Sequence, residues 1–449
     1  MTLALRPSSV STLTLNATKI PYVTETEKFN KSQDSNLIIN DSTGEDDLAD
    51  GEFRAWVVLF GTMCIAFTTS GYMSTWGVFQ AHYEQSVLKE LSPSTIAWIG
   101  SIQQSCLYIP TLIFAQFLDI KYFHTMLATA SLVFIVATFL IAQCNAYWQF
   151  LLLQGILTGI TAGVFTAPIT TILSQWFLRR RGLALGLYAA GSSMGGTILP
   201  IIARALIPLI GFPWTIRVVA SIIMLGMILG NLTIEQRTVS AASKGHSLDL
   251  SPMKSGIFIL YCSASFFIYL GYYTFTTYLT SSAISVGVSI SFSFYLVSVC
   301  NACSGMSRII SGLVADKFGA INLMIPAICL SSTTYYVWPF VHSQLGLIFL
   351  SVLYGVSIGP FAALVSKPVL DFGEKDQLGQ RVGILMSMVG IAMLTGTPIS
   401  GAVNKYTSPR TLGMGLFAGS TMLFGAILMA IFQYILRNHC TCRINIEKQ

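Results

Sequence analysis

Charge is scarce in this sequence. Asp, Glu, Lys and Arg make up 10% of its 449 residues, whereas about 25% is usual for a soluble domain. Hydrophobic residues make up 53%, and the mean hydropathy is +0.67. This balance excludes an ordinary soluble protein and predicts a protein embedded in a lipid bilayer.

Several motifs of soluble enzymes and pumps are also missing. The sequence has no Gly-Lys-Ser phosphate loop, no His-Glu-x-x-His motif and no matched Cys-x-x-Cys pairs, and its five histidines are not clustered. Most of the nine cysteines lie inside apolar runs, where thiols act as small apolar side chains. The sequence therefore implies no enzyme, no metal or other cofactor, and no nucleotide-binding subunit as a partner.

Long apolar runs occupy most of the chain. A helix needs about 20 apolar residues to cross a bilayer core, and about twelve runs reach that length. The predicted fold is therefore an all-α membrane protein with about twelve transmembrane helices. The predicted helices cover residues 55–80, 95–118, 123–143, 148–175, 182–207, 213–234, 255–280, 289–313, 320–340, 345–366, 380–402 and 411–436.

A polar break near the middle divides these runs into two sets of six. We predict an N-terminal half at residues 50–234, a cytoplasmic linker at 235–253 and a C-terminal half at 254–436. Residues 1–49 are rich in Ser, Thr, Asn and Asp and lack the apolar core of a signal peptide, so a disordered cytoplasmic tail is expected. Residues 437–449 are predicted to form a second cytoplasmic tail.

Three consecutive arginines, Arg179, Arg180 and Arg181, separate the fourth and fifth runs. Basic loops beside membrane helices face the cytoplasm, so this loop and both tails are predicted to be cytoplasmic. The net charge of +6 has the same origin, because most Lys and Arg residues fall on that side. The charge therefore indicates orientation and not a nucleic-acid partner.

The stretch from Trp176 to Gly191 contains more than a basic loop. An aromatic residue and Phe precede the arginines, and Leu-Ala-x-Gly and Ala-Gly follow them. This order resembles the signature between helices four and five of the monocarboxylate porter family, within the major facilitator superfamily. Residues 50–56 are similar to that family's other signature, although Glu52 and Arg54 stand where small residues are usual. The resemblance implies a secondary transporter with two six-helix halves that alternate access to a central site.

Another resemblance to the superfamily follows the second helix of each half. Residues 312–319 match the pattern Gly-x-x-x-Asp-basic-x-Gly, with Asp316 and Lys317 at the acidic and basic positions. The first half keeps only Asp119 of this pattern, and for Asp119 an ordinary solvated loop charge is an equal alternative. Together with the three arginines, these residues are predicted to gate the transporter by latching helix ends in one state.

One ionisable residue, Arg308, is predicted to lie deep within an apolar run. A charge at mid-membrane costs about 2.5–3.5 kcal/mol on insertion scales, so it marks a functional site by default. Its stretch is similar to the arginine-bearing eighth helix of the porters, and guanidinium suits an anionic or strongly hydrogen-bonding solute. The alternative is that Arg308 snorkels toward the cytoplasmic end. Other residues expected to bind substrate are Asn301, Gln103, Gln104 and Tyr273.

Two positions depart from the porter pattern. Proton-coupled lactate porters carry an acid four residues before this arginine and a lysine in the first helix, whereas Ser304 and Ser74 stand here. All 19 acidic residues fall in tails, loops or helix ends, so the sequence offers no titratable group near the midplane. Transport is therefore expected to be facilitated, or to use the proton only by carrying a protonated solute.

The predicted function is transport of a small anionic organic solute, monocarboxylate-like or vitamin-like, across a membrane. An exporter of a lipophilic secondary metabolite is the alternative within the same class. A non-transporting membrane sensor with the same fold is the alternative from another class. The expected partners are the solute and the lipid bilayer, and the plasma membrane is favoured over an internal membrane.

Overall fold

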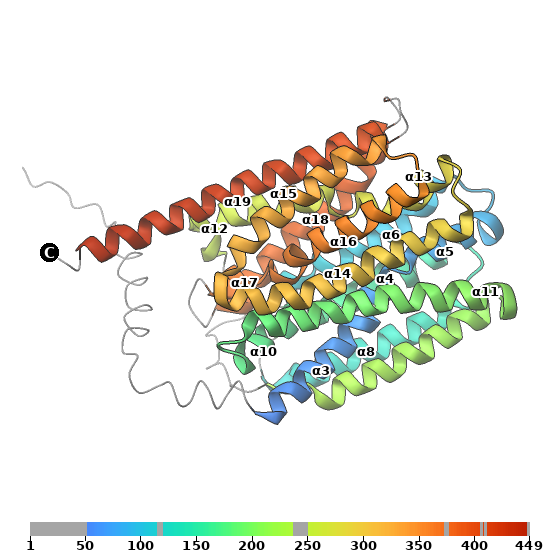
Figure 1. Cartoon of the computed structure of the whole chain (residues 1–449). Helices are drawn as coiled ribbons and strands as arrows, with labels where there is room; N and C mark the ends of the chain where they lie inside the picture. The colour runs from blue at the N-terminus through green and yellow to red at the C-terminus, as the bar shows by residue number, and fades with distance from the viewer. Residues whose placement is uncertain are drawn as a thin grey trace, which may run out of the picture. The chain divides into compact units, whose positions relative to one another are not determined.

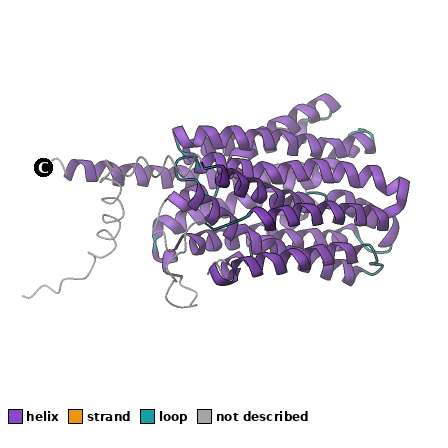
Figure 2. Ribbon diagram, turned by 90° about the horizontal axis from the view of Figure 1, so that it is seen from below, coloured by secondary structure: helices purple, strands orange, loops and turns teal. Residues whose placement is uncertain are grey.

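The computed structural model describes residues 52–114, 120–236, 250–371, 377–404, 407 and 411–446. Regular structure in these ranges is entirely helical (Figure 2). The first half contains α3 (Phe53–Thr68), α4 (Ser70–Met73), α5 (Trp76–His82), η1 (Tyr83–Val87), α6 (Pro93–Tyr108), α7 (Thr111–Phe114), α8 (Ile120–Ile141), α9 (Tyr147–Phe150), η3 (Leu151–Leu157), α10 (Thr158–Trp176) and α11 (Arg181–Thr233). The second half contains η4 (Ser251–Lys254), α12 (Gly256–Tyr272), α13 (Thr274–Ser285), α14 (Ile290–Phe318), α15 (Ala320–Val337), η5 (Trp338–Phe340), α16 (Gln344–Leu364), α17 (Lys367–Asp371), α18 (Leu378–Asn404) and α19 (Leu412–Ile446).

Ten helical stretches in the described ranges are long and apolar enough to cross a membrane. One of them, α11, has 53 residues and contains both the fifth and the sixth predicted helices. The second predicted helix corresponds to α6 and α7, which are not among the ten. Polar side chains such as Gln103 and Gln104 interrupt the apolar surface of α6. Each of the predicted helices therefore has a counterpart in the structure.

The turn between the fifth and sixth predicted helices is made at Gly211. Its φ of 77° and ψ of 162° lie in a region that residues with a Cβ atom rarely adopt. Pro208 and Pro213 flank it, and each lacks the N–H that would continue the helical hydrogen bonding. In Figure 1 the green ribbon of α11 folds back at its right-hand end.

Several spanning stretches are interrupted inside the bundle. The first, Phe53–Val87, is broken near Thr69 and Ser74 and ends in the π-helical turn η1. The fourth predicted helix contains a second π-helical turn, η3, and α12 meets α13 at Tyr273. Breaks of this kind occur where neighbouring helices can satisfy the freed backbone groups, and π-turns are frequent near functional sites.

The last helix is longer than expected. α19 continues to Ile446, past the predicted end at residue 436 and into the predicted tail. No glycine or proline follows Gly425 in this helix, so the sequence provides no stop signal before its end. The predicted tail at residues 1–49 lies outside the described residues.

Two helix pairs make the most extensive contacts between the predicted halves. α11 packs along α14, and α6 packs against α18. α11 also packs against α3, so it lies between the first helix of its own half and a helix of the other half. Figure 1 shows α11 and α14 running side by side over most of their length. The α11–α14 junction is where the main predicted site residue is found.

Candidate functional site

Arg308 lies on α14 and reaches across to α11. Its Nη1 donates hydrogen bonds to the Ala189 carbonyl oxygen at 2.8 Å and to the Ser192 hydroxyl at 2.6 Å. Its Nε lies 3.2 Å from Ser304 Oγ, and its Nη2 lies 3.4 Å from the hydroxyl of Tyr272 on α12. The half-buried guanidinium is therefore held among three helices at a junction of the two predicted halves.

The direction of the Arg308 side chain excludes the snorkelling alternative. Its backbone carbonyl lies against Gly186, near the start of α11. The guanidinium contacts Ala189 and Ser192, which are farther along α11 from the end that carries Arg181. The side chain therefore points into the bundle, away from the predicted cytoplasmic surface.

Tyrosine rings gather around this guanidinium. The Tyr272 ring packs against those of Tyr269 and Tyr273, with centroids 5.0 Å and 4.7 Å apart. The structure thus brings the predicted residue Tyr273 into one cluster with Arg308. Tyr272 was not predicted, because only folding brings it to Arg308 on α14.

Asn301 occupies the same junction two turns earlier on α14. Its Nδ2 donates to the Gly196 carbonyl oxygen of α11 at 3.1 Å. Gly196 also faces the first helix, since a Cβ atom placed on it would lie 2.9 Å from the Ser74 Cβ. Ser74, where proton-coupled porters carry a lysine, therefore lies beside Asn301 and not beside Arg308.

The two glutamines of α6 have different surroundings. Gln103 is buried, and its Nε2 donates to Thr158 Oγ1 of α10 at 2.9 Å. Thr158 in turn donates to the Gln154 carbonyl oxygen, so Gln103 belongs to a polar chain inside the first half. Gln104 is only half-buried, and no hydrogen bond of its side chain occurs among the described residues. Gln104 therefore fits an exposed binding role better than Gln103 does.

Asp316 joins the two halves near the C-terminal end of α14. Its carboxylate accepts hydrogen bonds from the backbone N–H groups of Gly182 at 2.7 Å and Leu183 at 2.9 Å. These N–H groups belong to the first turn of α11, where an acidic side chain satisfies free donors and the helix dipole. Lys317, the other residue of the predicted latch, is exposed in the last turn of α14.

An ion-pair network surrounds this cap. Lys367 Nζ lies 3.8 Å from Asp316 Oδ1 and 2.9 Å from Asp371 Oδ2. Arg181 Nη1 lies 3.3 Å from Asp371 Oδ1, so one residue of the basic loop joins the network. Arg179 and Arg180 are exposed at the same end. Asp119, the remaining predicted gating residue, lies outside the described residues.

The two porter-like signature stretches meet at this end of the molecule. The Trp56 and Phe177 rings pack edge to face with centroids 5.5 Å apart. Glu235, just after α11, binds both stretches: its carboxylate pairs with Arg54, and its carbonyl oxygen accepts from Trp176 Nε1 at 2.7 Å. Arg54, which departs from the family pattern, therefore has a structural role in tying the start of α3 to the end of α11.

α6 and α18 form a second junction of the halves, also toward this end. Ser387 Oγ of α18 donates to the Ile109 carbonyl oxygen at 2.7 Å and accepts from the Leu112 N–H at 3.3 Å. Thr111 Oγ1 lies 3.3 Å from the Gly383 carbonyl oxygen. We call this side, which carries Asp316 and the basic loop, the Asp316 end. Hydrogen bonds close both junctions there.

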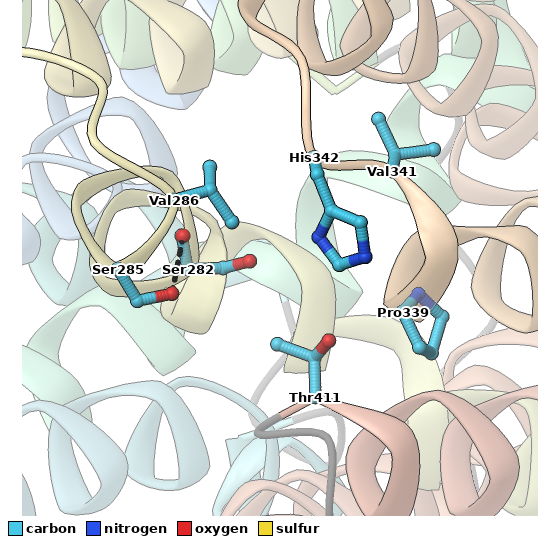
Figure 3. A pocket seen from close by; sticks show the side chains of 7 residues that line it. All are labelled: Ser282, Ser285, Val286, Pro339, Val341, His342 and Thr411. Atoms are coloured by element: carbon cyan, nitrogen blue, oxygen red, sulfur yellow. Dashed lines mark hydrogen bonds between the residues drawn. The ribbon is translucent and has the colours of Figure 1, made fainter.

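A small cavity lies at the other end of the bundle, within the second half (Figure 3). Its volume is about 270 Å³, and its lining comes from the end of α13, the connection between α15 and α16, and the residue before α19. Among the described residues that line it, His342 is the only titratable side chain. The cavity includes none of the residues around Arg308, so it is separate from the central cluster. We call this side of the molecule the His342 end.

Comparison with known proteins agrees with this architecture. A match to the Major Facilitator Superfamily covers residues 58–369, and an overlapping match covers residues 261–438. An MFS-type transporter of Gibberella moniliformis is 33% identical over 85% of this chain and 91% of its own length. An agnestins efflux protein of Paecilomyces divaricatus is 32% identical over 84% and 87%, and an aspyridones efflux protein of Emericella nidulans is 32% identical over 84% and 77%.

Solved structures share the fold at low sequence identity. The crystal structure of the human organic anion transporter MFSD10 superposes with a TM-score of 0.66 at 14% identity, covering 84% of this chain and 99% of that one. The transporter FucP in its outward conformation gives a TM-score of 0.63 at 15% identity, covering 84% and 98%.

The fold and the matches together define a multi-pass membrane transporter, not an enzyme. The chain belongs to the major facilitator superfamily. The predicted fold is thereby confirmed.

Proposed function

We propose that this protein exports a lipophilic secondary metabolite by alternating access. The observation that carries the proposal is the character of the central cluster, in which a single guanidinium lies beside Tyr272 and the two tyrosine rings packed on it. Such a site combines aromatic rings with few charges, which suits a bulky, mostly apolar solute with a polar group. Relatives named as efflux proteins for agnestins and aspyridones support export as the direction.

Two finer assignments accompany this proposal. The signature stretches that meet around Glu235 support placing the chain in the monocarboxylate porter family of the superfamily. The plasma membrane is the proposed location, because a metabolite that leaves the cell must cross it.

A small anionic solute, such as a monocarboxylate, is the second candidate. Arg308 favours it, since guanidinium binds carboxylates well. However, both N–H groups of Nη1 already have acceptors, at Ala189 and Ser192. A carboxylate that bound Nη1 and Nη2 together would have to displace one of these contacts. This occupied geometry makes a compact carboxylate the less favoured substrate in the state described.

The contacts of Arg308 suggest how the site could change during transport. Its partners Ala189 and Ser192 belong to the first half, whereas Arg308 and Tyr272 belong to the second. Rocking of the halves along the α11–α14 junction would break the contacts to α11 and release Nη1 donors for a solute. The same motion would remove the cap that Asp316 provides to α11.

A reconstitution experiment tests the proposal. Purified full-length protein in liposomes should transport a lipophilic compound from a panel that contains rhodamine 6G, sulforhodamine B and radiolabelled lactate. Arg308→Ala removes the arginine of the central cluster and should lower this transport. Its matched control is Arg217→Ala, because Arg217 lies over the Trp214 ring, away from that cluster. Transport of lactate alone would support the small-anion candidate. Binding without transport of any compound in the panel would support a sensor.

A further inference from the structure

The seventh predicted helix is broken beside the central cluster. α12 ends at Tyr272, whose hydroxyl lies 3.4 Å from Arg308 Nη2, and α13 begins at Thr274. Neither α12 nor α13 contains a proline. The break therefore has another cause, and a group inserted into the helical hydrogen bonding is one of the few that are known.

A tyrosine hydroxyl is inserted into the hydrogen bonding at this break. In a continuous helix the Phe275 N–H would donate to the Gly271 carbonyl oxygen, four residues earlier. Instead, the Phe275 N–H donates to the Tyr335 hydroxyl at 3.2 Å, and that hydroxyl donates to the Gly271 carbonyl oxygen at 2.6 Å. The regular pattern resumes where the Thr277 N–H donates to the Tyr273 carbonyl oxygen at 3.0 Å. Tyr335, a residue of α15, thus takes the place of one helical hydrogen bond.

The last carbonyl group of α12 is held by two tyrosines. The Tyr354 hydroxyl of α16 donates to the Tyr272 carbonyl oxygen, and the Tyr335 hydroxyl lies 3.2 Å from the same oxygen. A tyrosine hydroxyl has one proton, so Tyr335 gives its proton to the nearer oxygen, that of Gly271, and keeps its lone pairs for the Phe275 N–H. The backbone groups at the break therefore have defined partners on α15 and α16.

Packing fixes the positions of these hydroxyl groups. Tyr335 is fully buried, and only 1% of the Tyr354 surface is exposed. Their rings meet edge to face with centroids 5.6 Å apart. The Phe275 ring lies 4.5 Å from the Tyr354 ring and 5.0 Å from the buried Trp338 ring. Because side chains in so dense a core cannot move aside freely, the inserted hydroxyl holds the break in one geometry.

The break affects the central cluster through Tyr272. None of the hydrogen bonds that Tyr335 makes in the described part of the chain reaches Arg308. Tyr272 connects the two, because its carbonyl oxygen faces Tyr335 and its hydroxyl faces the guanidinium. A shift of the backbone at Tyr272 would also move its ring against those of Tyr269 and Tyr273.

We propose that Tyr335 is a positioning residue for solute binding, because its inserted hydroxyl sets the position of Tyr272 relative to Arg308. Without this hydroxyl, the Phe275 N–H and the Gly271 carbonyl oxygen regain their direct helical bond, since leaving both unpaired in a buried site is costly. The end of α12 then moves, and Tyr272 moves with it. The inference rests on the proposed export function and deepens it, because it concerns the shape of the same aromatic site.

The position of residue 272 can be followed without any solute. Tyr272→Cys places a thiol at the end of α12, and its labelling by a maleimide is timed in full-length protein in detergent, with the unsubstituted protein correcting for native cysteines. Adding Tyr335→Phe should raise the labelling rate by about fivefold, the effect of losing one hydrogen bond, because residue 272 leaves its buried position. Tyr336→Phe is the matched control, since the Tyr336 hydroxyl contacts Ser420 at an exposed site. It should leave the rate unchanged.

Solute binding provides the second measurement. In liposomes, Tyr335→Phe should raise the KM for rhodamine 6G by about five- to tenfold, with a smaller effect on kcat, because the altered site binds the solute less well. Tyr336→Phe should keep the wild-type KM. In the Tyr272→Cys background no ring remains to be positioned, so adding Tyr335→Phe should change KM by less than about twofold.

The results separate this inference from the export function. An unchanged labelling rate on adding Tyr335→Phe would overturn the proposal, whatever compound the protein transports. A lower melting temperature of Tyr335→Phe with a wild-type KM would leave Tyr335 a purely structural role, and an equal rise in KM with and without Tyr272 would show that Tyr335 does not act through it. If wild-type protein transports another compound of the panel, KM is measured for that compound. If it transports none, the export function fails, and the labelling still decides whether Tyr335 positions residue 272.

Discussion

Arg308 differs from a free cation in a cavity, because most of its donors already have acceptors. Nη1 and Nε bind groups on α11 and α14, and Nη2 has only the long contact to Tyr272. A solute can therefore gain a strong hydrogen bond at Nη2 or replace an internal partner. Replacing a partner of Nη1 couples solute binding to the junction between the halves, since Ala189 and Ser192 lie on the opposite half.

This arrangement predicts the effect of replacing the arginine. Arg308→Ala should lower transport of an anionic or polar solute by about 10- to 100-fold, which corresponds to about 1.5–3 kcal/mol for a charge-assisted hydrogen bond. Arg308→Lys should restore little of the rate, because an ammonium group cannot contact α11 and α12 together as the planar guanidinium does. Initial rates in liposomes, normalised to reconstituted protein, provide the measurement. Wild-type rates in Arg308→Ala would exclude a role in solute binding.

Single residues differ in how far the sequence alone could place them. Arg308 was predictable because a charge within an apolar run stands out against its surroundings. The difference in burial and hydrogen bonding between Gln103 and Gln104 was not predictable. Adjacent helix positions differ by about 100°, and only the packed structure shows that Gln103 meets Thr158. Tyr272 was missed for the same reason, since no local pattern connects it with Arg308.

At the scale of elements, the close packing of α11 on α14 requires glycine, which has no side chain, at the points of contact. A Cβ atom on Gly186 would lie 2.5 Å from the Arg308 carbonyl oxygen, and one on Gly312 would lie 2.5 Å from the Gly182 carbonyl oxygen. Both distances are shorter than a Cβ can tolerate, so these helices touch through their backbones. These glycines lie on different helices, and only the folded structure shows which helix each of them meets.

A substitution at Gly186 tests this junction. Gly186→Ala should destabilise the described state by about 1–3 kcal/mol, because the added methyl group meets a backbone that cannot move aside locally. Gly256→Ala is the control, since a Cβ atom there has no neighbour within 4 Å. Thermal unfolding in detergent should shift for Gly186→Ala and not for Gly256→Ala. Equal shifts for the two variants would show that the close approach does not limit stability.

The cap that Asp316 provides to α11 gives a second test at this scale. Asp316→Asn keeps the size of the side chain but removes the charge that favours the helix N-terminus, which is worth about 0.3–2 kcal/mol. The closed Asp316 end should become less populated, by as much as about 5- to 30-fold for one or two kcal/mol. Hydrogen exchange at the Gly182 and Leu183 amides should then accelerate. Lys317→Gln is the control, because the Lys317 side chain is exposed, and its amide exchange should stay at the wild-type rate. Unaltered exchange in Asp316→Asn would show that the Asp316 charge does not stabilise the closed end.

At the scale of the whole molecule, the two ends of the bundle differ. The Asp316 end carries the basic loop, the Asp316 cap and the bonds of Ser387 to α6, all of which bring the predicted halves together. The His342 end has Gly77 exposed on the first helix, with no atom within 4 Å of the position its Cβ would take. Sequence patterns predicted the helices and the basic loop. They could not predict which end is closed, because one sequence must support both states of an alternating transporter.

The orientation of these ends in the membrane gives the last prediction. Positive charge at the Asp316 end predicts that this end faces the cytoplasm and that the His342 end faces outward. Lys89→Cys and His342→Cys place cysteines at exposed positions on the predicted outer side. His342 is chosen over the neighbouring Ser343 because the Ser343 hydroxyl accepts a hydrogen bond from the Gly346 N–H and caps α16. Both cysteines should react with an impermeant thiol reagent on intact cells if the protein is at the plasma membrane. Arg180→Cys should react only after permeabilisation, and the unsubstituted protein corrects for its own cysteines. Labelling of Arg180→Cys on intact cells, with Lys89→Cys protected, would reverse the orientation.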